Sequence, residues 1–205
     1  MNQTQDFTKG VIWKQLLFFF FPILIGSFFQ QLYNTVDTII VGQTVGTSAL
    51  AAVGSTGNLT NLIINFYVGL STGASVVIAQ YYGAQNNKKI HQAVHTSYSL
   101  AIVSGILMML FGLFFSYQCL DAIGTPHDIL NDATLYMQLY FLCMIPGAIY
   151  NIGAGILRAV GDSKRPLYYL IVCSIVNVVF DFIFVVIFHQ GIAGAAIATV
   201  IAQFV

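Results

Sequence analysis

Five long apolar runs constrain this sequence more than any other feature. They cover residues 15–38, 50–79, 93–116, 133–157 and 167–188. About 20 apolar residues in a helix cross the roughly 30 Å hydrocarbon core of a bilayer, and each run reaches that length. Only 7% of the 205 residues are charged, whereas about 25% are charged in a typical soluble domain. The sequence therefore predicts an all-α integral membrane protein that is surrounded by membrane lipid.

A sixth apolar run begins at Gly191 and reaches the last residue of the sequence, Val205. A helix of that length covers only about 22 Å, which is too short to cross the membrane. We therefore expect a single six-helix bundle over residues 1–205, in which the sixth helix, 191–205, is cut short.

The basic residues indicate how the helices are oriented. The connections 39–49, 117–132 and 189–191 contain no Lys or Arg. All basic residues lie before the first run or in the other connections, at Lys9, Lys14, Lys88, Lys89, Arg158, Lys164 and Arg165. Because basic loops stay on the cytoplasmic side, we predict a multi-pass protein of the cell membrane with a cytoplasmic N-terminus. The net charge is zero, and without a clustered basic surface we expect no nucleic-acid partner.

Two carboxylates remain inside the predicted membrane, Asp37 in the first run and Asp181 in the fifth. The others fall in loops or near the N-terminus, at Asp6, Asp121, Asp128, Asp132 and Asp162. A charge at mid-membrane costs from about 2.5 to more than 10 kcal/mol, so such acids usually face the protein interior or a water-filled cavity. For Asp37 a structural interpretation stays open, either as a hydrogen-bonding residue or as a residue at the water boundary.

Helical spacing gives both acids polar neighbours. Asn177 precedes Asp181 by one turn, and Gln30 and Asn34 share a helix face with Asp37. These faces predict where the bundle interior is polar.

The depth of each residue follows from the rise per residue. Asp181 lies about 21 Å above the inner end of its helix, and Thr199 lies about 18 Å above the same membrane edge. Asp37 lies higher by the same count, so we expect the first helix to tilt or to bend. Proline deletes a backbone hydrogen bond, and Pro22 is the expected bend.

Two carboxylates, an amide and a hydroxyl form a set of oxygen ligands: Asp37, Asn177, Asp181 and Thr199. Such oxygens suit Na⁺, and a desolvated carboxylate can instead take up a proton. We therefore predict a site for Na⁺ or H⁺, without any other metal or cofactor.

A further polar stripe follows the second run, where Asn58, Asn61 and Asn65 recur at helical spacing. It either lines a cavity or holds closely packed helices together by hydrogen bonds. Tyr136 and Tyr140 lie one turn apart and face either a cavity or the aromatic belt of the membrane surface, with the belt favoured. We keep Tyr136 as a candidate for lining the cavity.

Four stretches, in order along the chain, resemble the multidrug and toxic compound extrusion (MATE) transporters. ILRAVGDSKRP at 156–166 resembles the family's LRAxGDxxxP loop. QQLYNTVDTIIVG at 30–42 with ALAAVG at 49–54, GASVVIAQYYGAQN at 73–86 and GIAGAAIATVIAQ at 191–203 are similar to its first, second and sixth helices.

The resemblance implies the first half of a twelve-helix exporter built from two six-helix bundles. It implies a cation site at Asp37, Asn177, Asp181 and Thr199, a helix bend at Pro22 that accompanies cation or proton loading, and a role for Tyr136. The expected function is antiport of amphipathic, often cationic drugs against H⁺ or Na⁺. The expected partners are the drug and a second bundle, which is either a missing C-terminal half or another chain.

Three alternatives predict different features. A lipid-linked oligosaccharide flippase of the same superfamily needs cationic side chains in its cavity, but every Lys and Arg here lies at a loop or helix end. An intramembrane aspartyl protease needs a GxGD turn within a helix, and the Gly161–Asp162 pair lies among basic residues of a loop. A fragment that does not transport is the third alternative. We expect no enzymatic activity.

Overall fold

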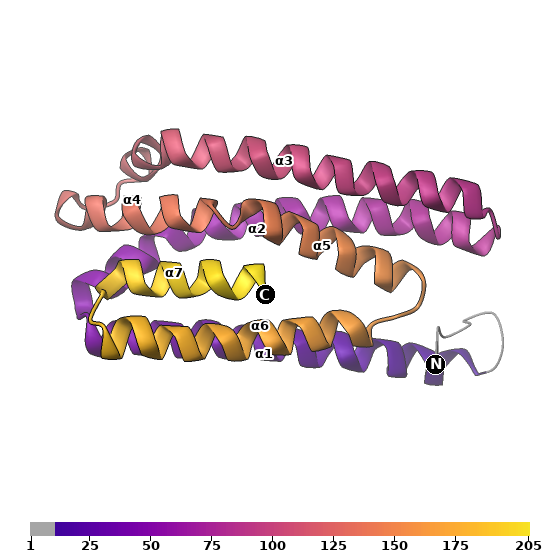
Figure 1. The fold of residues 1–205 in the computed structure, drawn as a ribbon, viewed down its shortest axis with the longest axis horizontal. Helices are drawn as coiled ribbons and strands as arrows, with labels where there is room; N and C mark the ends of the chain where they lie inside the picture. The colour runs from indigo at the N-terminus through magenta and orange to yellow at the C-terminus, as the bar shows by residue number, and fades with distance from the viewer. Residues whose placement is uncertain (1–10) are drawn as a thin grey trace.

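The computed structural model describes residues 11–205, and its regular elements are all helices (Figure 1). Asp6 and Lys9, which the sequence places on the aqueous side, lie outside these residues. The helices are α1 (Ile12–Thr44), α2 (Thr47–Gly83), α3 (Asn87–Ala122), α4 (His127–Phe141), α5 (Met144–Ala159), α6 (Lys164–Asp181), the π-helix η1 (Phe182–Ile187) and α7 (Gly191–Phe204).

Several of these helices are long and apolar enough to cross a membrane. Within the described residues, four stretches qualify: Trp13–Thr44, Thr47–Gly83, Asn87–Ala122 and Lys164–Ile187. The pair α4 and α5 adds a fifth if it counts as one span, and α7 is apolar but shorter. The prediction of an all-α, multi-pass membrane protein is confirmed.

The predicted fourth helix, 133–157, is divided in two. α4 ends at Phe141 and α5 begins at Met144, and the two axes are bent by 51°. Pro146 in the first turn of α5 explains the break, since its ring has no N–H and clashes with the carbonyl of Leu142 one turn earlier. At the break, the Cys143 N–H donates to the Tyr140 carbonyl at 3.1 Å, across three residues instead of four.

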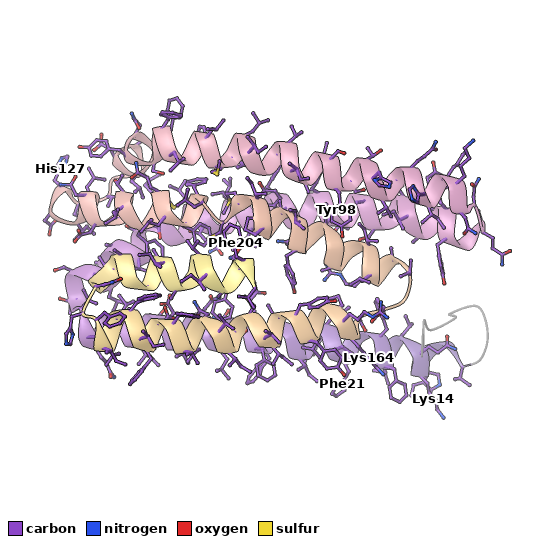
Figure 2. The ribbon with its side chains drawn as sticks, in the orientation of Figure 1. Lys14, Phe21, Tyr98, His127, Lys164 and Phe204 are labelled. Atoms are coloured by element: carbon purple, nitrogen blue, oxygen red, sulfur yellow. The ribbon has the colours of Figure 1, made fainter. Side chains whose placement is uncertain are left out.

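The helices form two groups that α7 joins (Figure 1). α1 packs on α6, whereas α2 and α3 pack on α4 and α5. α7 contacts both α4 and α6, and its C-terminal end lies midway along the bundle. Figure 2 shows Lys14 and Lys164 at one end of the bundle and His127 at the other. We call the first of these the basic end.

Small residues bring the helices of the larger group close together. A Cβ atom at Gly112 of α3 would lie 1.8 Å from the ring of Phe141, so this ring occupies the space above the glycine. On α2, the Ser71 hydroxyl donates a hydrogen bond of 2.6 Å to the carbonyl of Asn151 on α5. These contacts fix α2, α3, α4 and α5 as one framework beside the α1–α6 pair.

Candidate functional site

The C-terminal end of α6 and the middle of α7 share a buried polar contact. The Asn177 amide nitrogen donates to the Thr199 hydroxyl oxygen at 3.3 Å. The Thr199 hydroxyl donates to the carbonyl of Ala195 at 3.1 Å. Asp181, the last residue of α6, lies one turn beyond Asn177 and is 0% exposed. The structure thus brings these three predicted residues into one buried region.

Small residues let α7 come this close. A Cβ atom at Gly194 would lie 3.1 Å from both the backbone carbon and the Cβ of Phe184 in η1. The chain reverses between η1 and α7 through two residues with positive φ, His189 at 52° and Gly191 at 59°. This tight return places Thr199 beside α6, where a larger side chain at Gly194 would push α7 away.

The packing of α1 on α6 places Asp37 in the same region. A Cβ atom at Gly26 would lie 3.4 Å from a methyl group of Leu170, so these two residues face each other. Asp37 follows Gly26 by eleven residues and Asp181 follows Leu170 by eleven. Both acids therefore lie about 16 Å further along two helices that run in the same direction. This contact lies beyond Pro22, so the register of α1 on α6 places the two acids at a similar level, and the expected bend at Pro22 stays a prediction.

The buried oxygens of this region are unpaired. Both carboxylate oxygens of Asp181, one of Asp37 and the amide oxygen of Asn177 have no hydrogen-bond partner among the described residues. The Asp37 carboxylate lies within electrostatic range of Asp181. Buried acceptors without partners are costly and two nearby carboxylates repel each other. A cation or a proton between them would relieve both effects.

Two tyrosine side chains lie near the acids. Tyr136 of α4 is 8% exposed, and its hydroxyl lies within electrostatic range of Asp37, Asp181, Tyr33 and Tyr140. The preference for the membrane belt is therefore wrong for Tyr136, which lies inside the bundle. Sequence analysis missed Tyr33, although its spacing of four residues from Asp37 was a usable signal.

The remaining polar candidates lie elsewhere. Pro22 is buried within the continuous helix α1. The amide side chains on α1 and α2 are exposed on the surface of this bundle, at Gln30, Asn34, Asn58, Asn61 and Asn65. They do not line a cavity inside it.

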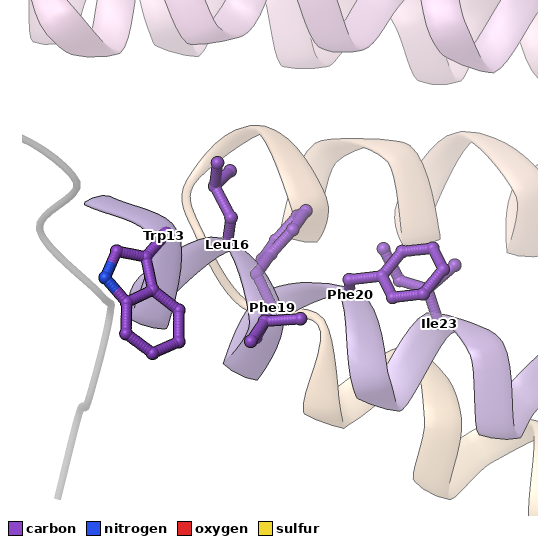
Figure 3. Close-up of a pocket in the computed structure, with 6 residues that line it drawn as sticks. Trp13, Leu16, Phe19, Phe20 and Ile23 are labelled. Atoms are coloured by element: carbon purple, nitrogen blue, oxygen red, sulfur yellow. The ribbon is translucent and has the colours of Figure 1, made fainter. Parts of the chain in front are cut away.

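An apolar hollow near the basic end is separate from the acids. Figure 3 shows its lining, which comes entirely from the first turns of α1: Trp13, Leu16, Leu17, Phe19, Phe20 and Ile23. Asp37 lies fourteen residues beyond Ile23, or about 21 Å along the helix. A surface of this composition suits lipid chains.

The chain is similar to known transport proteins. It is 31% identical over 203 residues to a Bacillus subtilis protein named "Probable multidrug resistance protein YoeA", covering 97% of this chain and 44% of that protein. A crystal structure of MATE in the bent conformation matches the whole chain and 45% of its own length, with a TM-score of 0.92 and 27% identity. MATE in the straight conformation matches 93% of the chain and 42% of its own length, with a TM-score of 0.87 and 29% identity.

These matches fall on the N-terminal half of the solved transporters. The chain thus spans less than half the length of the relatives that it matches. The family model named MatE matches residues 22–183, which include most of α1, all of α2 to α6, and both Asp37 and Asp181. The chain belongs to the MatE family.

Proposed function

We propose that this chain is the ion-coupling half of a secondary exporter, which moves amphipathic, often cationic drugs out of the cell in exchange for Na⁺ or H⁺. The observation that carries the proposal is Asp181, which is fully buried and has both carboxylate oxygens unpaired in range of Asp37. The name of the Bacillus subtilis relative, a multidrug resistance protein, supports the drug part of the proposal.

The proposed ligands are the unpaired oxygens of Asp37, Asp181 and Asn177, together with the Thr199 hydroxyl, which also accepts a hydrogen bond from the Asn177 amide nitrogen. Asp37 and Asp181 supply the negative charge, and the Asn177 amide and the Thr199 hydroxyl supply neutral oxygen. Hard oxygen ligands suit Na⁺, and protonation of one carboxylate removes the same repulsion. Because α1 contributes one acid and α6 the other, loading of the site changes how strongly α1 is held against α6.

Transport also requires a moving part and a second bundle. Pro22 interrupts the hydrogen bonding of α1, and we propose that α1 bends there when the site changes its load. An ion drives transport only if it binds the two conformations with different affinity, and rocking of two bundles provides alternating access. The N-terminus lies in the cytoplasm, so ions enter from the end of the bundle opposite the basic end.

The alternative functions find no specific support. Asp162, the acid of the Gly-Asp pair, accepts hydrogen bonds from the backbone N–H groups of Lys164 and Arg165 at 3.1 and 3.2 Å. It also forms a 3.1 Å ion pair with the Arg165 side chain. These contacts place Asp162 at the start of α6, whereas Asp181 lies at the other end of the same helix. The described Lys and Arg residues all lie in the first or last turn of a helix, whereas a flippase needs cationic side chains deeper in its cavity to bind pyrophosphate.

The test supplies the chain with a second bundle and measures dye efflux from vesicles under an imposed Na⁺ or pH gradient. We expect efflux that depends on one gradient and is lost in Asp181→Asn. Asp132→Asn, which changes an exposed acid of α4, is the matched control and should transport normally. Efflux that ignores both gradients, or that survives in Asp181→Asn, would refute antiport.

A further inference from the structure

Two histidine side chains lie next to each other near the start of α3. His91 and His95 are one helical turn apart, so they share a face of the helix. The centres of their rings are 4.4 Å apart, and the ring planes make an angle of 48°. Both side chains are exposed, and neither ring forms a hydrogen bond with the described residues. Their nitrogens are therefore available to a ligand from solution.

The separation of the two rings fits one metal ion between them. A histidine nitrogen binds a transition metal at about 2.0 Å, which places the metal about 3.2 Å from the centre of the ring. Two rings that bind the same ion at a right angle therefore have centres about 4.5 Å apart, whereas a tetrahedral angle requires about 5.2 Å. The observed distance of 4.4 Å matches the right angle. The backbone of α3 thus holds the pair at the separation that a square-planar or octahedral ion needs.

The ligands and the charges nearby decide which ion fits. Neutral imidazole suits Ni²⁺, Cu²⁺ and Zn²⁺, and right-angled sites of nitrogen and oxygen ligands favour Cu²⁺ or Ni²⁺. Among the described residues no third His, Cys, Asp or Glu joins the pair, so water completes the coordination. The Lys89 ammonium lies 5.4 Å from the centre of the Tyr81 ring on α2. Lys88, one turn before His91, is exposed and repels a divalent ion.

We propose that His91 and His95 form a surface site for Cu²⁺ or Ni²⁺, with water at the remaining coordination positions. This site departs from the expectation that the chain binds no metal other than Na⁺. It is separate from the buried acids, because it lies on α3 near the connection 84–86, whereas Asp181 ends α6. An ion that binds both rings joins two successive turns of α3. It therefore stabilises the start of this helix beside its connection to α2.

The test titrates Cu²⁺ and Ni²⁺ separately into the full chain, purified in detergent without a polyhistidine tag, and measures binding by isothermal titration calorimetry. We expect one site, whose affinity falls at least about tenfold in His91→Gln and in His95→Gln, because each variant keeps a single imidazole. Lys88→Gln should instead strengthen binding about twofold or more, with the largest gain at low salt. Zn²⁺ should bind more weakly than Cu²⁺ and no more tightly than Ni²⁺.

His127→Gln is the matched control. His127 is also exposed and begins a helix, but it lies at the opposite end of the bundle and has no histidine one turn away (Figure 2). The variant should bind Cu²⁺ within about twofold of the unchanged chain. Undiminished binding in either His91→Gln or His95→Gln, or an equal loss in His127→Gln, would overturn the assigned site. Absence of binding in the unchanged chain would do the same, and Zn²⁺ that binds more tightly than Ni²⁺ would overturn the right-angled geometry.

Discussion

The contact between Gly26 and Leu170 leads to a prediction about the two acids. In Gly26→Ala the new methyl group would lie 3.4 Å from Leu170 and 3.6 Å from Leu167, which is ordinary van der Waals contact. Alanine also favours the helix by about 1 kcal/mol. We therefore expect Gly26→Ala to be neutral or stabilising by up to that amount. Gly26→Leu adds three more carbon atoms to a space that is already at contact distance, which costs about 1–3 kcal/mol.

The larger consequence of Gly26→Leu concerns the separation of α1 from α6. Asp37 lies on one helix and Asp181 on the other, at nearly the same level, so a wedge between the helices draws the carboxylates apart. Na⁺–oxygen contacts weaken when a ligand moves by an ångström. We therefore expect the Na⁺ concentration that half-protects the two carboxyl groups from carbodiimide labelling to rise about tenfold or more.

The assay labels the buried carboxyl groups with a carbodiimide and measures the products by mass spectrometry over a range of Na⁺ concentrations. The unchanged chain and Gly26→Ala should give the same protection curve, and Gly26→Leu should be shifted while its helical circular dichroism remains. An unshifted curve for Gly26→Leu would show that the register of α1 on α6 does not bring the acids together. Protection by high pH alone in the unchanged chain would assign H⁺ instead of Na⁺.

Three further predictions concern stability and site geometry. Gly112→Leu should destabilise the bundle by about 3 kcal/mol or more, since even its Cβ would overlap the Phe141 ring. Thermal unfolding in detergent measures this loss. An unchanged unfolding midpoint would contradict the contact between Gly112 and Phe141. Asp162→Ala removes the acceptor of the first backbone N–H groups of α6 and should cost about 1 kcal/mol in the same assay. Efflux by the two-bundle protein should stay normal. Lost efflux would give Asp162 a role beyond capping the helix. Thr199→Val leaves the Asn177 amide without its acceptor and should cost about 1–3 kcal/mol of stability. Thr199→Ser should restore both this stability and the Na⁺-dependent protection of the carboxyl groups. Failure of Thr199→Ser to restore them would show that the methyl group, and not the hydroxyl, is what matters.

The sequence predicted the overall fold because membrane insertion imposes strong constraints. Apolar runs of membrane length and the restriction of Lys and Arg to alternate connections indicated both the spans and the segregation of charge that Figure 2 shows at Lys14 and Lys164. The two acids stood out because the apolar runs contain no other Asp, Glu, Lys or Arg. These signals are local, so they can be read without knowledge of which helices are neighbours.

The features that sequence analysis missed depend on contacts between helices. The break before α5 follows from Pro146, but proline is tolerated in many membrane helices, as Pro22 is within α1. Counting residues along single runs does not give the register of α1 on α6, which depends on the contact between Gly26 and Leu170. Tyr33 was missed although it lies four residues before Asp37, because an aromatic residue in a membrane helix needs no functional explanation by itself.

The directions of two hydrogen bonds decide which atom of Asn177 is left unpaired. Thr199 directs its only proton to the Ala195 carbonyl, so its oxygen is free to accept the amide nitrogen of Asn177. The Asn177 amide oxygen is left without a hydrogen-bond partner among the described residues, as are both carboxylate oxygens of Asp181 and one of Asp37. We expect a region with these unpaired acceptors to bind a cation or a proton and to exclude chloride or phosphate.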